Sequence, residues 1–105
     1  MTGEEIKRMS WAARRGRLHG LRERVWVALG QARDMRVPGL TTRSLADALG
    51  VDILCVRPRV TELCQLGLAR CVGGVRHEGL YAQVSLAEAE EAYRRESSPQ
   101  MEMEL

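Results

Sequence analysis

A chain of 105 residues has room for one domain and its tails, and 45% hydrophobic with 29% charged residues is typical of a globular protein. No apolar run approaches the roughly 20 residues of a membrane span. The first residues also lack the apolar segment of a signal peptide, so we expect a cytoplasmic protein. The net charge of +2 is uneven: residues 1–36 carry nine Lys and Arg against four Asp and Glu, whereas residues 86–105 carry two against six.

Residues 1–17 are predicted to form a basic arm ahead of the domain. Five cations surround Trp11 in this segment, namely Lys7, Arg8, Arg14, Arg15 and Arg17. Such an arm can lie along nucleic-acid phosphates or enter the minor groove. The alternative is a solvated helix whose Trp11 covers an edge of the core, and the residues are compatible with both.

An amphipathic helix is predicted over residues 18–35. Its apolar stripe recurs at helical spacing and consists of Leu21, Val25, Ala28, Leu29 and Ala32. The run Val37-Pro38-Gly39 ends this helix, because proline cannot continue it and glycine turns the chain. Leu40 is then expected to form a short first strand. Because Phe is absent from the chain, we expect the core to consist of Leu, Val and Ala.

Two further helices are predicted on either side of Gly50. Thr41 is a suitable N-cap for residues 42–49, since its hydroxyl can accept a free backbone N–H of the first turn. Gly50 can adopt the left-handed conformation that ends a helix without a Cβ clash. Asp52 is a plausible N-cap for the second helix.

The spacing of small and apolar residues around Gly50 is that of a helix-turn-helix. Ala46 lies four residues before the glycine and Val56 six after it, so the helices can approach closely and bury the valine. At about 100° per residue, the inward positions of the second helix are Val56, Val60, Leu63 and Gly67. The outward positions are Leu54, Pro58, Thr61 and Gln65.

Charged residues flank this outward face. Arg57 and Arg59 lie on its two shoulders, and Glu62 lies near it, where it can pair with Arg59. The face is therefore not strongly basic, which weakens a nucleic-acid assignment. Pro58 removes one backbone hydrogen bond from the helix, and we expect a kinked but continuous helix there.

A β-hairpin is predicted after Gly67. Residues 68–72 and 80–84 read as its strands, and residues 73–79 form a turn-rich tip. Arg76 and His77 at this tip are placed to reach a phosphate or the minor groove.

A C-terminal helix is predicted from Ser85, which forms a capping box with Glu88. The helix is expected to run to about residue 95 and to pack on the helix over residues 18–35, or to pair with its copy in a homodimer. Residues 87–105 are therefore assigned to this helix and a flexible acidic tail.

The run Val-Arg-Pro-Arg-x-x-Glu-Leu over residues 56–63 and the run Leu-x-x-x-Gly-Leu over residues 63–68 resemble the recognition helix of winged-helix proteins. The resemblance extends over roughly residues 21–86 and is greatest to small phage and prophage proteins and to MarR-like domains. It implies an α+β winged helix-turn-helix over residues 18–86. Such a domain has a three-helix core, a wing of two or three β-strands and, here, a short C-terminal helix.

The resemblance also implies a double-stranded DNA-binding protein, such as a bacterial or phage transcriptional regulator or replication factor. Its recognition helix would enter the major groove beside a basic wing. Arg43 and Arg76 would contact phosphates and Arg57 a base edge. The full set of candidate DNA contacts is Thr42, Arg43, Leu54, Arg57, Pro58, Thr61, Gln65, Arg76 and His77. The neutral outward face favours the alternative, a winged-helix module that binds another protein instead of DNA.

An enzyme is not expected, because the chain has no Ser-His-Asp set and no phosphate-cradling glycine motif. The three cysteines, Cys55, Cys64 and Cys71, lack Cys-x-x-Cys spacing and are expected to be free thiols. Neither a metal, a cofactor nor a small-molecule substrate is therefore predicted.

Overall fold

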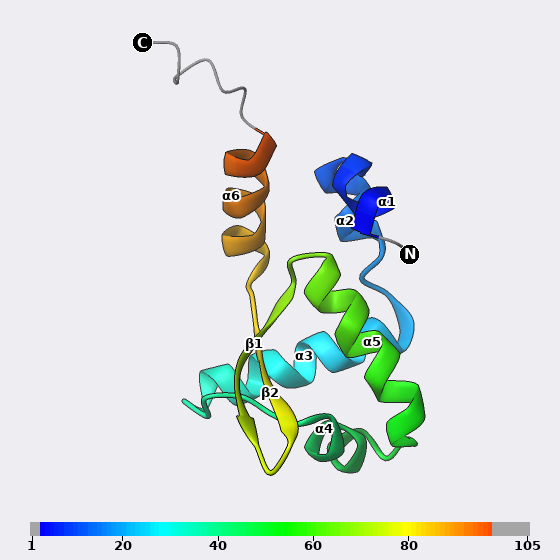
Figure 1. Cartoon of the computed structure of the whole chain (residues 1–105), viewed down its shortest axis with the longest axis vertical. Helices are drawn as coiled ribbons and strands as arrows, with labels where there is room; N and C mark the ends of the chain where they lie inside the picture. Colours follow the sequence, from blue (N-terminus) through cyan, green and yellow to red (C-terminus); the bar gives the residue numbers. More distant parts are fainter. Residues whose placement is uncertain (1–2, 98–105) are drawn as a thin grey trace.

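Six helices and a two-stranded antiparallel sheet make up residues 3–97, the part of the chain that the computed structural model describes (Figure 1). The elements in chain order are α1 (Gly3–Arg8), α2 (Trp11–Gly16), α3 (Gly20–Asp34), α4 (Thr42–Leu49), α5 (Ile53–Gln65), β1 (Ala69–Val75), β2 (Glu78–Gln83) and α6 (Leu86–Ser97). The predicted α+β class is confirmed, and the arrangement is compatible with a winged helix.

The body of the protein consists of α3, α4, α5 and the β1–β2 hairpin. Figure 1 shows α4 and the hairpin tip side by side, with α5 rising along one flank. As predicted, the core is aliphatic; its fully buried side chains are Val25, Leu29, Leu45, Val56, Val60, Leu63, Leu66 and Leu68. Burial of each such side chain contributes about 1.5–3 kcal/mol through the hydrophobic effect.

The predicted helix over residues 18–35 is α3, two residues shorter at its start and one at its end. Its stripe faces the core: Val25, Leu29 and Ala32 are buried, and the remaining two residues are half-buried. Two residues after the end of α3, Arg36 adopts a φ of 62°, and the N–H of Val37 donates to the carbonyl of Ala32. Leu40 then exchanges two backbone hydrogen bonds with Tyr81, which adds the expected short strand at the edge of β2.

The capping pattern around Gly50 is confirmed. The Thr41 hydroxyl accepts the N–H of Ser44 at 3.0 Å, and the Asp52 carboxylate accepts the N–H of Leu54 at 2.7 Å. Gly50 ends α4 with a φ of 67°. Each of these three predictions depends only on neighbours in the chain.

Helix α5 is continuous through Pro58, as predicted. Because Pro58 has no backbone N–H, the carbonyl of Leu54 receives no helical hydrogen bond. Leu54 is 69% exposed, so water can solvate this carbonyl. Val56, Val60 and Leu63 point inward, but the inward assignment of Gly67 is wrong. Gly67 is exposed and ends α5 in the left-handed conformation, and Leu66 is buried instead.

The hairpin is longer and its turn tighter than predicted. The strands pair up to Val75 and Glu78, so the turn contains only Arg76 and His77, and the predicted seven-residue tip is wrong. Both turn residues have positive φ, as in a type I′ turn. Such turns usually contain Asn-Gly or Asp-Gly, so Arg-His gave no signal in the sequence. A bulge at Val72 shifts the register halfway along β1.

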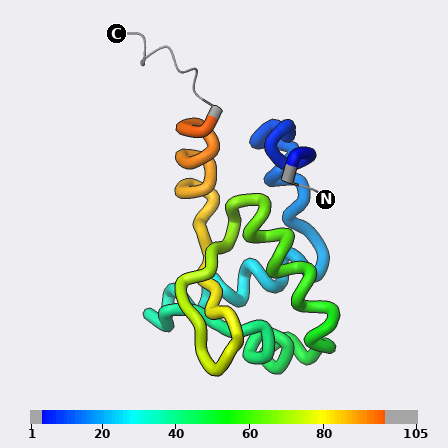
Figure 2. Tube along the Cα trace, in the orientation of Figure 1, coloured from blue at the N-terminus to red at the C-terminus, as the bar shows by residue number. Residues whose placement is uncertain are grey.

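A second layer consists of α1, α2 and α6, which leave the body at one end and lie side by side (Figures 1 and 2). The segment predicted to be a basic arm is therefore helical over most of its length, and Trp11 packs against the core. The rings of Trp11 and Tyr93 lie 6.1 Å apart. The guanidinium of the buried Arg14 lies 4.8 Å from the centre of the Tyr93 ring and donates to the carbonyl of Ile6.

The capping box at the start of α6 is confirmed. The N–H of Ser85 donates to the Glu88 carboxylate at 3.0 Å, and the N–H of Glu88 donates to the Ser85 hydroxyl at 3.2 Å. Helix α6 meets α3 through an ion pair between Glu88 and Arg33, and its Ala89 is buried. It ends two residues later than predicted. The acidic tail that follows lies outside the described residues.

Candidate nucleic-acid interface

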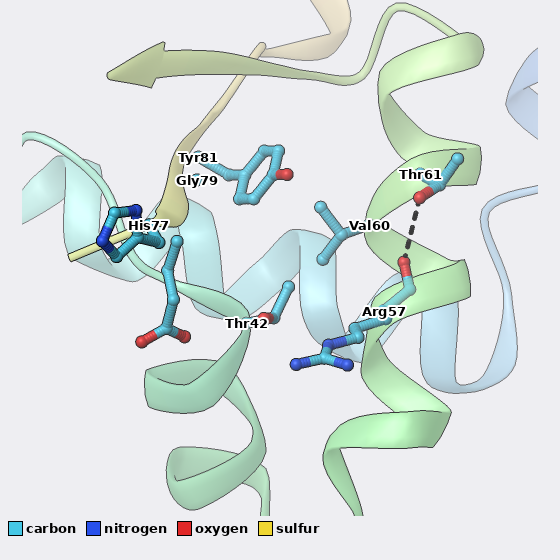
Figure 3. A pocket seen from close by; sticks show the side chains of 8 residues that line it. Thr42, Arg57, Val60, Thr61, His77, Gly79 and Tyr81 are labelled. Atoms are coloured by element: carbon cyan, nitrogen blue, oxygen red, sulfur yellow. Dashed lines mark hydrogen bonds between the residues drawn. The ribbon is translucent and has the colours of Figure 1, made fainter. Parts of the chain in front are cut away.

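A cleft of about 330 Å³ lies between the start of α4, the middle of α5 and the hairpin from its turn to the beginning of β2. Figure 3 shows Arg57, Val60 and Thr61 on α5 facing His77 and Tyr81 across this cleft, with Thr42 at one side. Its lining residues are Thr42, Arg57, Val60, Thr61, His77, Glu78, Gly79 and Tyr81. Four of the nine candidate DNA contacts therefore meet in one place, although they come from three separate elements.

The other five candidate contacts do not line this cleft. Leu54, Pro58 and Gln65 are exposed on the outward face of α5, as the helical spacing predicted. Arg43 lies one residue after Thr42 at the start of α4. Arg76 is exposed in the hairpin turn.

Arg57 is the most available cation of the cleft. Its side chain is exposed, and within residues 3–97 its guanidinium has neither a hydrogen-bond nor an ion-pair partner. Its carbonyl oxygen accepts a hydrogen bond from the Thr61 hydroxyl at 3.2 Å (Figure 3). The guanidinium is thus free to form a bidentate contact with a ligand.

Glu78 brings a carboxylate into the same cleft, and sequence reasoning had missed it. Its Oε2 lies 3.6 Å from Nε of Arg43, whereas its Oε1 is buried and has no hydrogen-bond partner. A carboxylate at this place repels a phosphate and competes with it for Arg43. The two-residue turn explains the omission, because a seven-residue tip would have left Glu78 in a solvated loop.

Tyr81 forms the wall of the cleft on the hairpin side. It lies between Cys71 of β1 and Leu40 in the sheet, and its ring covers Gly79, where an added Cβ would lie 2.7 Å from the hydroxyl oxygen. Burial raises the pKa of Tyr81, and the nearby Cys71 and Cys64 thiols raise this pKa further. The phenol is therefore neutral at physiological pH and can donate a hydrogen bond.

The acidic residue near the outward face of α5 is balanced by arginines. Glu62 is 19% exposed and lies 2.9 Å from Arg22 of α3 and 2.8 Å from Arg59 of α5. The predicted pairing of Arg59 with Glu62 is therefore confirmed. Because Glu62 has two cationic neighbours, it weakens a nucleic-acid assignment less than its position in the sequence suggested.

Searches of protein-family models, curated proteins and solved structures found no match to this chain. None of the helices described here is long and apolar enough to cross a membrane. Within residues 3–97, no group of three His, Cys, Asp or Glu side chains is arranged to hold a metal ion.

Proposed function

We propose that this protein binds double-stranded DNA as a winged helix-turn-helix protein, with α5 as recognition helix and the β1–β2 hairpin as wing. One observation carries the proposal: Thr42, Arg57, Thr61 and His77, each selected from the sequence as a DNA contact, line one cleft. Such a protein would act in the cytoplasm as a regulator of transcription or as a replication factor.

The dimensions of α5 support a position in the major groove. A helix with its side chains is about 10–12 Å wide, and the major groove of B-form DNA is about 12 Å wide. The exposed side of α5 carries Leu54, Thr61 and Gln65, which can contact a thymine methyl group or hydrogen-bond to base edges. With α5 in the groove, the cleft beside it lies next to one phosphate backbone.

The basic side chains are expected to take two different roles. Arg57 is the candidate for a bidentate contact with guanine, the commonest specific pairing in the major groove. Arg76 and His77 in the turn, and Arg43 at the start of α4, are expected to contact phosphates, which position the protein without reading sequence. Arg76 and His77 adopt positive φ, and strain of this kind clusters at binding sites.

The experiment is an anisotropy titration with the protein of two labelled duplexes, the selected duplex with the sequence that the protein prefers and a random duplex, at two salt concentrations. Arg57→Ala should weaken binding to the selected duplex by roughly 1–3 kcal/mol and to random DNA much less. Arg76→Ala should weaken both about equally and reduce the salt slope by about one unit. Arg95→Ala, at an exposed arginine of α6, is the matched control and should bind as the wild type does.

A substitution of Glu78 should change the affinity for DNA in the opposite direction. Glu78→Gln removes a negative charge from the cleft and frees Arg43, so it should tighten binding to every duplex and make the salt dependence steeper. A purely structural role for Glu78 predicts weaker binding in this titration. If the wild type binds no duplex even at low salt, the DNA proposal is wrong.

The second candidate function is a winged-helix module that binds another protein. This function is favoured by Leu54, which is 69% exposed next to the apolar ring of Pro58. This part of α5 carries no charge that could attract DNA. Leu54→Ser should abolish binding of such a partner, whereas it should change the affinity for random duplex DNA little.

A further inference from the structure

A second cleft, of about 270 Å³, lies between the end of α3, residues 36–39 and the part of the hairpin that carries Arg70, Val72 and Ala82, and Gln83 also lines it. Arg70 of β1 is paired with Ala82 of β2, one position along from Cys71 and Tyr81. Side chains alternate between the two faces of a sheet. The face of Arg70 and Ala82 is therefore turned away from the cleft that Tyr81 lines. The end of α3 and residues 36–39 form the other wall of this second cleft.

The charges that line this cleft are all positive. They belong to Arg33, Arg36 and Arg70, and no Asp or Glu is among the lining residues. Arg33 is paired with Glu88 of α6, and the charge of Asp34 also acts on it. Within residues 3–97, the guanidinium groups of Arg36 and Arg70 have no ion-pair or hydrogen-bond partner.

Arg36 occupies a backbone position at which glycine is the usual residue. Three helices of the body end on a residue in the left-handed region: α4 at Gly50, α5 at Gly67 and α3 at Arg36, with a φ of 62°. A side chain is strained there, whereas glycine is not. The chain thus keeps a guanidinium at the rim of this cleft despite the backbone strain, and such outliers point to a function.

Apolar groups complete the wall beside the arginines. Val37 is 39% exposed and Val72 is 41% exposed, and Pro38 lies next to Val37. Unlike a phosphate backbone, an acidic polypeptide also carries apolar side chains that can cover exposed valines. The ion pair of Arg33 with Glu88 shows that a carboxylate from a neighbouring segment already docks at this edge of the cleft.

We propose that this second cleft binds an acidic, extended segment of a partner protein. Its carboxylates pair with Arg36 and Arg70, and its apolar side chains cover Val37 and Val72. The surface is distinct from the DNA interface, because the two clefts share no lining residue. A protein that binds DNA through α5 can therefore bind an acidic partner at the same time.

The test is an NMR titration of the full chain with a soluble ten-residue peptide of alternating Glu and Val. The backbone amide signals of Arg36, Val37, Arg70 and Val72 should shift together and saturate, while those of α5 stay unchanged. A peptide of alternating Lys and Val is the matched control and should cause no shifts at the same concentrations.

Two variants separate binding from folding. Arg36→Gly removes the guanidinium and relieves the backbone strain, so its melting temperature should equal or exceed that of the wild type. Its affinity for the Glu-Val peptide should fall about two- to fivefold, as expected for one exposed ion pair. Arg70→Ala should lower the affinity by a similar factor with no change of backbone conformation.

Three outcomes would overturn the proposal. The first is no shift at millimolar peptide, or shifts confined to α5 and the hairpin turn. The second is equal binding of the Lys-Val and Glu-Val peptides. The third is a random DNA duplex that shifts the amides of Arg36 and Arg70 and loses affinity in Arg36→Gly, which would assign this surface to nucleic acid.

Discussion

The body and the second layer of this protein are stabilised by different kinds of contact. In the body, every fully buried large side chain of the described residues is Leu or Val, and these come from α3, α4, α5 and the segment between α5 and β1. In the second layer of α1, α2 and α6, the buried residues are Ile6, Ala89 and Arg14. Its aromatic contacts converge on Tyr93, and an exposed ion pair attaches α6 to α3.

This difference predicts a difference in local stability. Aliphatic burial is proportional to area and does not depend on any single geometry, so the body should unfold as one cooperative unit. The second layer buries only the small apolar area of Ile6 and Ala89, and the contacts of its buried guanidinium depend on the position of a few atoms. We therefore expect α1, α2 and α6 to open at a lower free energy than the body.

The largest effect is expected for Val56→Asp in the body. Val56 of α5 is completely buried, and an Asp there must bury either an unpaired carboxylate or an unsatisfied carboxyl group, at a cost comparable to the about 5–15 kcal/mol that typically stabilises a domain. Circular dichroism should show an unfolded chain. Val27→Asp, at a 43% exposed valine of α3, should stay folded. A folded Val56→Asp variant would contradict the register of α5.

A smaller loss is expected for Gly50→Val, also in the body. Space is not limiting, since an added Cβ meets no atom within 4 Å, but the φ of 67° is unfavourable for a β-branched residue. The free energy of unfolding should fall by more than about 1 kcal/mol. Ala48→Val on the exposed side of α4 should cost less in the same urea titration. Equal losses would mean that backbone conformation is not limiting here.

Arg14→Ala should destabilise the second layer selectively. It removes a buried hydrogen bond to Ile6 and the contact with Tyr93, at a local cost of roughly 1–3 kcal/mol. Hydrogen exchange should become faster in α1, α2 and α6 and stay unchanged in α3 and α5. Arg15→Ala, at the exposed neighbour, serves as control. Uniformly faster exchange would show that both layers unfold as one unit.

The smallest effect concerns the pH dependence of the second layer. The hydrogen bond from Arg33, followed by that from the Ser85 N–H, lowers the pKa of Glu88 from 4.5 to about 2. The pair thus stabilises the folded state above pH 4.5, and this contribution is lost as the pH falls toward 2. In Glu88→Gln, melting of α6 should depend less on pH across that range. Glu91→Gln should behave as the wild type does, and an unchanged profile in Glu88→Gln would exclude this ion pair as the cause.

Part of the candidate site was predictable and part was not. The outward face of α5 and its shoulders follow from the 100° step between helical residues, so Thr61 and Arg57 could be selected without coordinates. Glu78 could not be selected from the sequence, because its position in the cleft depends on a turn formed by Arg76 and His77. Neither of these is a usual turn residue. The cleft itself results from α5 and the hairpin packing together.

The sequence by itself determined the caps and the inward faces of the body. Thr41, Asp52 and the Ser85–Glu88 capping box act within three residues of chain, and the burial of Val56, Val60 and Leu63 follows from helical period. Only the tertiary structure decided that the N-terminal segment folds onto α6 and that Glu78 meets Arg43. Such contacts join residues far apart in the chain, where side-chain size and charge allow many partners and the packing of whole elements selects one.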